Sequence, residues 1–318
     1  MSQEKIDIYK RLLYIRIAEE ELIKLYLDKK LFSMVHFYVG EEASAVGVCD
    51  ALGADDKVFG NHRSHGHYLA KGGNFKRMVA ELIGRKGGLA KGKGGSMHMI
   101  DKSVNFAGST PLLGSVAPIA AGSAFEQKYN RKKTITAAFF GDGASEEGVV
   151  YETYHLASLY RLPLLLVIEN NGHSINSRTA DRRGDRYDLS TILAGFGVEY
   201  RKADGNDYND VYNRAKELAE YVRRESRPAV LEVMVYRHMA HSTPLMEEGY
   251  RDIDTAEIRA KSDPLAKVKS ALLAEGASEA ELAALGDEMR ARMVKEIEEA
   301  LAMPYPDKEE MYEDVFAQ

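Results

Sequence analysis

Apolar residues near the N-terminus follow a helical period. Between residues 6 and 29 they recur on one face, as at Leu12, Ile15 and Leu22, with charged residues between them. This spacing predicts an amphipathic helix. Because its apolar face must be buried, we expect the helix to cover the sheet of the protein or a partner chain.

The central part of the chain alternates between helical and strand-like segments. Helical patterns cover residues 117–129, 146–160 and 210–225, and apolar runs typical of buried strands cover residues 134–140, 164–168 and 229–235. Alternation of this kind is typical of parallel βαβ units. The sequence therefore predicts an α/β fold with a mostly parallel sheet flanked by helices.

Two further regions depart from this alternation. Glycines and histidines crowd together between residues 59 and 99, where we expect loops that approach a ligand closely. After residue 254 the pattern is helical and charged, with a capping box at Ser278 and Glu281 and a stop near Pro304. We expect one α/β domain over residues 1–255, including the N-terminal helix. Residues 256–318 are expected to form a helical C-terminal extension packed on the same unit.

Charge and composition exclude some classes of function. The 318 residues carry a net charge of −6, so there is no basic surplus to neutralise a phosphate backbone, and nucleic acid is not expected as a partner. No apolar run is long enough to span a membrane, and the N-terminus lacks the apolar core of a signal peptide. We therefore expect a cytoplasmic protein, or one of an organelle matrix. The single cysteine, Cys49, has apolar neighbours and is interpreted as a core residue.

A glycine-rich turn follows the apolar run at residues 134–140. It reads Gly141-Asp142-Gly143-Ala144 and continues into a helical pattern. Glycines allow backbone N–H groups to point at an anion, and a helix N-terminus favours negative charge. The turn has neither the lysine of a P-loop nor the spacing of a dinucleotide fingerprint. By itself it is weak evidence for a phosphate site.

The next apolar run ends in a second polar motif, Glu169-Asn170-Asn171-Gly172-His173. Because the carboxyl ends of neighbouring parallel strands meet at one edge of a sheet, Asp142 and Asn171 are expected to converge. A carboxylate, an amide oxygen and a nearby backbone carbonyl are ligands that Mg²⁺ accepts. The two motifs together predict a magnesium site at this edge.

A Gly-Asp-Gly turn followed about thirty residues later by Asn-Asn resembles the thiamine-diphosphate-binding motif. Around it, residues 13–251 are similar to the alpha subunits of the pyruvate, acetoin and branched-chain 2-oxo acid dehydrogenases, with further matching stretches that begin at His36, His62, Gly92 and Tyr236. The resemblance implies a thiamine-diphosphate-binding fold, with thiamine diphosphate and Mg²⁺ as cofactors. It also implies a reaction that decarboxylates a 2-oxo acid, or cleaves acetoin, and passes the acyl group to a lipoyl carrier.

The resemblance assigns a role to each matching residue. The implied magnesium ligands are the side chains of Asp142 and Asn171 and the backbone carbonyl of His173. The implied cofactor-binding residues are His62, Arg63, Pro111, Leu113, Gly141, Asp142, Gly143, Ala144, Asn171 and Arg237. Among these, Arg63 and Arg237 match arginines that bind the diphosphate, and Leu113 matches the residue that props the two cofactor rings. His65 and His241 match catalytic histidines that handle protons on the substrate or orient the lipoyl group.

Three positions depart from the family's pattern. Glu41 stands where glutamine is usual, Met239-Ala240 replaces a pair that ends in glycine, and Ser109-Thr110-Pro111 replaces a glycine-rich loop. The last two changes fall near the substrate end of the site, so the substrate stays open between pyruvate, a branched-chain 2-oxo acid and acetoin. His62 before Arg63, together with Ala70-Lys71-Gly72, favours the acetoin-type sequences.

The resemblance also implies partners. In this family the carboxylate that activates the cofactor comes from a beta subunit, and no second domain here supplies it. We therefore expect an assembly of two alpha and two beta chains that serves a lipoyl acyltransferase, with the small-residue segment 117–124 as a contact between chains. The polar loop at residues 243–254 is expected to become ordered over the bound diphosphate.

Two alternatives remain. The same fold and cofactor can serve a non-oxidative acyl transferase or carboligase. A more distant alternative interprets His62, His65 and His67 as metal ligands of a hydrolase. The second alternative leaves the Gly-Asp-Gly to Asn-Asn pattern without a role.

Overall fold

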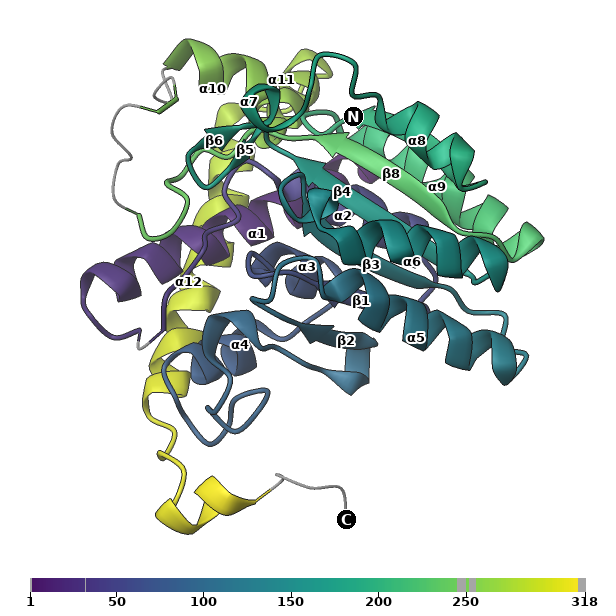
Figure 1. Cartoon of the computed structure of the whole chain (residues 1–318). Helices are drawn as coiled ribbons and strands as arrows, with labels where there is room; N and C mark the ends of the chain where they lie inside the picture. Colours follow the sequence, from purple (N-terminus) through teal and green to yellow (C-terminus); the bar gives the residue numbers. More distant parts are fainter. Residues whose placement is uncertain (1, 32, 245–249, 252–255, 314–318) are drawn as a thin grey trace.

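A six-stranded parallel sheet with helices on both faces forms the centre of the protein (Figure 1), as seen in the computed structural model, which describes residues 2–31, 33–244, 250–251 and 256–313. The strand order is β2-β1-β3-β4-β8-β7, and every neighbouring pair is parallel. The strands are β1 (Lys57–Gly60), β2 (Phe106–Ser109), β3 (Thr136–Gly141), β4 (Leu164–Asn170), β7 (Glu199–Asp204) and β8 (Ala229–Met234). The predicted α/β fold is confirmed, although β1, β2 and β7 were not recognisable as strands because they are short or largely polar.

The middle of the sheet is buried on both faces. All residues of β4 and all but the last of β3 are buried, which explains their continuous apolar runs. The register pairs Thr136 with Leu164 and Gly141 with Glu169. Both strands therefore end at the same level, and the two polar motifs that follow them begin side by side.

One face of the sheet is covered by three helices, α5 (Val116–Tyr129), α6 (Gly148–Leu159) and α8 (Leu189–Gly195). In α5 the small residues Ala117, Ala120 and Ala124 are buried against the sheet and α6. These alanines are therefore used within the chain, whereas Gly122 in the same segment is exposed and faces open space. The expected contact of segment 117–124 with another chain stays a prediction. The outer face of α5 carries larger apolar side chains instead, including Ile119 and Phe125.

The opposite face is covered first by α2 (Glu42–Ala51), α3 (His65–Ala70) and α9 (Tyr208–Glu225). The expected N-terminal helix is α1 (Gln3–Leu27), which lies outside α2 and α3 as a further layer. Cys49 is buried in α2, and burial raises the pKa of its thiol to about 12. The cysteine is therefore a core residue, as expected.

Two helices occupy part of the region that was expected to be loops, namely α3 and α4 (Phe75–Leu82). The glycines there serve helix packing. A Cβ atom on Gly66 would lie 2.1 Å from the ring of Tyr38, so only glycine lets α3 approach that ring. The expectation was correct for most of residues 83–99, where the backbone forms turns.

The C-terminal part is helical, as expected. It consists of α10 (Ala256–Ser262), α11 (Pro264–Ala274) and α12 (Glu279–Leu301), and Ser278 and Glu281 form the predicted capping box. Helix α12 packs against α1 and α4. The remaining short elements are η1 (Gly95–Met97), η2 (Lys102–Val104), η3 (Ala144–Glu146), η4 (Lys308–Tyr312), β5 (His173–Ser174), β6 (Ser177–Arg178) and α7 (Thr179–Arg182). Among the described residues, no helix is long and apolar enough to cross a membrane.

A buried ion cluster joins the outer helices to the sheet layer. Arg16 in α1 binds Glu42 through Nε and Nη2, at 2.6 and 3.1 Å, and binds both carboxylate oxygens of Asp263 at 3.0 Å. Glu42 is fully buried and also accepts hydrogen bonds from the N–H of Gly40. One guanidinium thus ties α1 to the start of α2 and to the residue before α11.

We expect Arg16→Met to destabilise the protein by about 3–5 kcal/mol, because Glu42 would remain buried without its cation. Denaturant unfolding followed by circular dichroism measures the change. Arg178→Gln is the matched control: Arg178 pairs with Asp181 at the surface, so we expect a change of about 0.5 kcal/mol or less. Equal effects of the two substitutions would contradict the role given to Arg16.

Candidate active site

A cavity lies at the carboxyl edge of β3 and β4. Ten residues that were predicted from the sequence line it, namely His62, Arg63, Leu113, Gly141, Asp142, Gly143, Ala144, Asn171, His173 and His241. They come from segments far apart in the chain that the parallel sheet brings to one edge. The expected convergence of Asp142 with Asn171 is therefore observed.

The turn after β3 presents one carboxylate to the cavity. Asp142 is 1% exposed, and its Oδ2 accepts hydrogen bonds from Thr179 Oγ1 at 2.8 Å and from Arg182 Nη2 at 2.6 Å. Among the described residues, Oδ1 of Asp142 accepts no hydrogen bond. Beyond the turn, η3 precedes α6, so the helix begins at Gly148 and not directly after the glycines.

The loop after β4 closes tightly on this turn. The Oδ1 atom of Asn171 accepts a hydrogen bond from the N–H of His173 at 3.0 Å, which fixes the amide. A Cβ atom on Gly143 would lie 2.4 Å from Oγ of Ser174, so the two loops touch where only glycine fits without a shift.

Two arginines at the end of this loop hold the turn from the other side. Arg182 binds Glu146 at 2.9 Å in addition to Asp142, and Arg183 binds Glu146 at 2.7 Å. Arg183 also donates to the carbonyl oxygen of Asp142 and to Oγ of Ser145. The segment from β5 to α7 is thereby fixed on the glycine turn.

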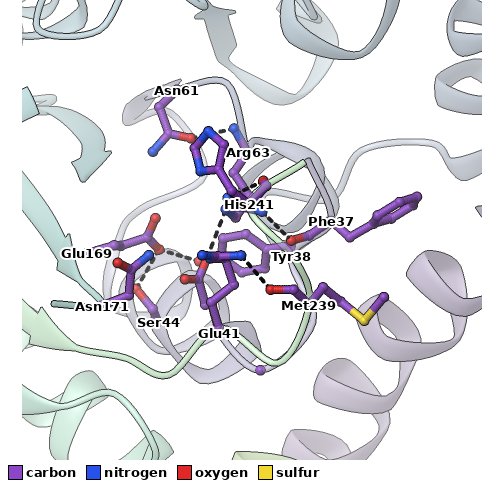
Figure 2. Close-up of polar contacts among 12 residues, drawn as sticks. Phe37, Tyr38, Glu41, Ser44, Asn61, Arg63, Glu169, Asn171, Met239 and His241 are labelled. Carbon is purple, nitrogen blue, oxygen red and sulfur yellow. Dashed lines mark hydrogen bonds and ion pairs between the residues drawn. The ribbon is translucent and has the colours of Figure 1, made fainter. Parts of the chain in front are cut away.

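Arg63 supplies a buried cation to the lining of the cavity, and Figure 2 shows its polar contacts. It is 4% exposed and donates to the carbonyl oxygens of Phe37 at 2.7 Å and His241 at 2.9 Å. Burial lowers the pKa of its guanidinium to about 10, so it stays protonated at neutral pH. The backbone of two other segments therefore holds this charge in a fixed position.

Two buried carboxylates balance that charge. Glu41 is 2% exposed with an oxygen 3.8 Å from Nε of Arg63, and burial raises its pKa to about 7 despite the arginine. Glu169, at the end of β4, accepts hydrogen bonds from Tyr38, Ser44 and His67. Burial opposes ionisation of Glu169, but His67 and the other donors lower its pKa.

Histidines also line the cavity, and a further histidine packs against two of them. His62 and His241 line it, and the ring of His36 packs behind them, with its centroid 4.5 Å from that of His62 and 5.1 Å from that of His241. Burial, with a contribution from Arg63, lowers the pKa of His36 to about 3 and that of His62 well below its usual value. At neutral pH both imidazoles are uncharged.

Three predicted residues do not line the cavity. His65 has no exposed surface, and its two ring nitrogens lie 3.0 Å from Glu19 and 2.8 Å from Ser96. Arg237 is 2% exposed and donates to the carbonyl oxygen of Met239 and, at 3.0 Å, to the hydroxyl of Tyr250. Pro111 is half-buried beside the cavity-lining Leu113. The helical direction of α3 turns His65 toward α1 and away from the cavity.

The histidine set proposed for a hydrolase is not assembled. His67 stacks on Phe139 with centroids 4.1 Å apart and binds Glu169, while His65 binds Glu19. Each is used separately in the core, so neither can join His62 as a ligand of one metal ion.

Several residues of the site were not predicted from the sequence. Glu169, Asn61, Ser174 and Ile175 also line the cavity. A charge at the end of an otherwise apolar strand was a signal for Glu169. No signal marked Arg182, because its contact with Asp142 spans forty residues. Of the loop expected to become ordered over the diphosphate, residues 245–249 and 252–254 lie outside the described residues.

The donors of the cavity suit a phosphorylated ligand with a divalent metal ion. Asp142 and Asn171 offer hard oxygen atoms, as Mg²⁺ requires. Gly143 and Ala144 bring backbone N–H groups to the same wall, and the guanidinium of Arg63 suits phosphate oxygens. The residues present therefore fit the cofactor that the sequence resemblance implies.

Comparison with known proteins agrees with this geometry. Residues 10–309 match the model of a protein family described as "Dehydrogenase E1 component". The chain is 36% identical over 315 residues to the pyruvate dehydrogenase E1 component subunit alpha of Rhizobium meliloti, covering 99% of this chain and 90% of that protein. It is also 36% identical over 316 residues to the protein of the same name from Zymomonas mobilis, covering 98% of this chain and 88% of that protein. The mitochondrial protein of that name from Dictyostelium discoideum is 33% identical over 321 residues, covering 100% of this chain and 83% of that protein.

We expect the double substitution Arg182→Gln and Arg183→Gln to release the segment from β5 to α7 from the glycine turn, since their bonds to Asp142, Ser145 and Glu146 are lost. Hydrogen exchange of the amides in this segment should become faster by on the order of tenfold, which corresponds to about 1.4 kcal/mol of opening free energy. Arg178→Gln, in the same segment with an exposed partner, is the control and should leave exchange near the turn unchanged. Unaltered exchange in the double variant would show that these bonds do not fix the segment.

Proposed function

The chain belongs to the dehydrogenase E1 component family, as the alpha subunit of a thiamine-diphosphate-dependent 2-oxo acid dehydrogenase, and we propose that its substrate is pyruvate. The observation that supports the function best is the convergence of Asp142, Asn171 and Arg63 on one cavity. The names of the similar proteins favour pyruvate. Branched-chain 2-oxo acids and acetoin are the substrates to compare with it, because Met239-Ala240 and Pro111 depart from the family's pattern.

The metal ion that we propose here is Mg²⁺, held by the side chains of Asp142 and Asn171 and the backbone carbonyl of His173. Hydrogen bonds from Thr179 and Arg182 occupy Oδ2 of Asp142, which leaves Oδ1 as the oxygen that faces a metal. Hydrogen-bond partners of a metal-binding side chain orient that side chain and hold it in place. Arg182 therefore acts on the metal through Asp142.

When bound, thiamine diphosphate would supply the nucleophilic carbon that reaction at the 2-oxo group of the substrate requires. For the diphosphate we propose the N–H groups of Gly143 and Ala144 together with the guanidinium of Arg63, all of which belong to residues that line the cavity. Leu113 is 46% exposed at the cavity, which suits an apolar support for the rings of the cofactor. Glu41 lies beside Arg63, and its raised pKa allows it to exchange a proton near neutral pH.

We propose that His62 and His241 form hydrogen bonds to the substrate and exchange protons with it. Both line the cavity, and burial keeps His62 uncharged. An uncharged imidazole can donate a hydrogen bond to a substrate oxygen and accept a proton from it. For His65, which the resemblance also places in catalysis, its bonds to Glu19 and Ser96 favour a structural role.

As an alpha subunit, the chain acts with a beta subunit and a lipoyl-bearing component. We propose an assembly of two alpha and two beta chains in the cytoplasm. The outer faces of α5 and α6 offer a contact surface, because Ile119, Phe125, Tyr129, Leu159 and Tyr160 are all exposed there. Apolar patches of this kind mark interaction sites.

We expect Asp142→Ala to weaken magnesium-dependent binding of thiamine diphosphate to the assembled enzyme by at least about a hundredfold. Loss of a metal ligand should cost no less than the 10–100-fold that loss of a ligand's supporting partner costs. Calorimetric titration with the cofactor and Mg²⁺ measures the affinity. Asp181→Ala, an exposed carboxylate in α7, should bind as the unmodified enzyme does, and equal affinity in both variants would remove Asp142 from the site.

We expect the purified chain to turn over neither pyruvate, branched-chain 2-oxo acids nor acetoin, because the carboxylate that activates the cofactor belongs to the beta subunit. Addition of the beta subunit should give reduction of an artificial electron acceptor, fastest with pyruvate. Full activity of the alpha chain alone would contradict the division between subunits. Faster dye reduction with acetoin or a branched-chain acid would contradict the proposed substrate.

A further inference from the structure

Three histidines from separate parts of the chain meet at the cavity. His36 follows α1, His62 follows β1, and His241 follows β8. One ring nitrogen from each lies within 4.8 Å of one ring nitrogen of both others. Among the described residues, this is the group of histidine, cysteine and acidic side chains whose arrangement could hold a metal ion.

Two nitrogen atoms of the cluster are buried without a partner. The Nδ1 atoms of His36 and His62 have no hydrogen bond among the described residues, and His36 is only 5% exposed. A buried polar atom without a partner is costly, so such atoms point to a ligand that they bind or to a functional role. The neighbouring rings lie nearly perpendicular to His36, at 89° for His62 and 80° for His241.

We propose that His36, His62 and His241 form a binding site for a divalent transition metal ion of the zinc type, distinct from the magnesium site at Asp142. Zinc binds imidazole nitrogen at about 2.0–2.1 Å in a tetrahedron, which places neighbouring ligand nitrogens about 3.4 Å apart. Small rotations of His62 and His241, which are only half-buried, close the difference from 4.8 Å while His36 stays fixed. The fourth position faces the cavity.

The ligand chemistry separates the two sites. Three imidazoles favour zinc, cobalt, nickel or copper, whereas Mg²⁺ prefers the oxygen atoms of Asp142 and Asn171. The charges near the histidines are mixed: Arg63 and Arg237 oppose a cation, and the buried carboxylate of Glu41 favours one. Arg63 already donates to the carbonyl oxygens of Phe37 and His241, which keeps its guanidinium in place beside the cluster.

A metal ion in this site would inhibit the enzyme. It would occupy ring nitrogens of His62 and His241, the histidines that we assign to work on the substrate. This consequence rests on the proposed function, whereas metal binding itself depends only on the three side chains. The two parts can therefore be tested separately.

The binding test titrates the full-length chain with Co²⁺ in excess Mg²⁺, and then adds Zn²⁺. Tetrahedral Co²⁺ has visible absorption bands that octahedral Co²⁺ lacks in comparable strength. We expect one Co²⁺ per chain with these bands, their loss when Zn²⁺ displaces the cobalt, and at least tenfold weaker binding in both His36→Gln and His62→Gln. His98→Gln and His155→Gln, which change exposed histidines, are the controls and should bind as the original chain does. Circular dichroism verifies that each variant is folded, and His62→Gln keeps the test valid if burial of His36 makes its variant unstable.

Unchanged cobalt binding in folded His36→Gln and His62→Gln would overturn the proposal. So would bands that persist in these variants but disappear in Asp142→Ala, because the ion would then occupy the oxygen site. The inhibition test adds Zn²⁺ to the assembled enzyme, where we expect dye reduction to fall and a chelator to restore it. Zinc binding to the histidines without inhibition would support the metal site and contradict the catalytic roles given to His62 and His241.

Discussion

The parallel pairing of β3 with β4 is the constraint on which the site depends. Its register places Gly141 opposite Glu169, so both strands end at one level and the polar residues after them share one edge. A shift of this register by two residues would move Asp142 away from Asn171 by about 7 Å. Both strands are buried on both faces, so a slip of the register would disrupt side-chain packing on each face.

That edge contains an unusual density of buried charge. Arg63, Glu41 and Glu169 are each at most 4% exposed, and each is compensated by hydrogen bonds or by an opposite charge. Buried ion pairs add little net stability, but loss of one partner is expensive. The network is therefore better understood as fixing the geometry of the cavity than as stabilising the fold. Glu41, which stands where the related sequences usually have glutamine, lies near Arg63 and Arg237, whose charges favour its ionised form.

The outer helices position the elements around the site. In helix α1, Glu19 binds His65 and Arg16 binds Glu42. Because His65 and Glu42 are the first residues of α3 and α2, these contacts hold both helices in place from the side of α1. On the other face of the sheet, α5 and α6 use their small residues inward and expose larger apolar ones. Ion pairs and hydrogen bonds thus hold the helices beside the cavity, and α5 and α6 present apolar side chains at the surface.

The sequence by itself determined the fold class, the family and the position of Asp142 and Asn171, because apolar runs specify buried parallel strands and the residues after such strands must meet at one edge. It also determined the capping box of α12 and the core position of Cys49, which depend on neighbouring residues alone. Only the tertiary structure decided which histidine faces the cavity. His65 and His241 were equivalent in the sequence, yet the turn of α3 directs His65 to Glu19, while His241 follows β8 to the cavity. The contact of Arg182 with Asp142 and the meeting of His36 with His62 likewise join distant segments, and no local pattern encodes a contact that the packing of the sheet creates.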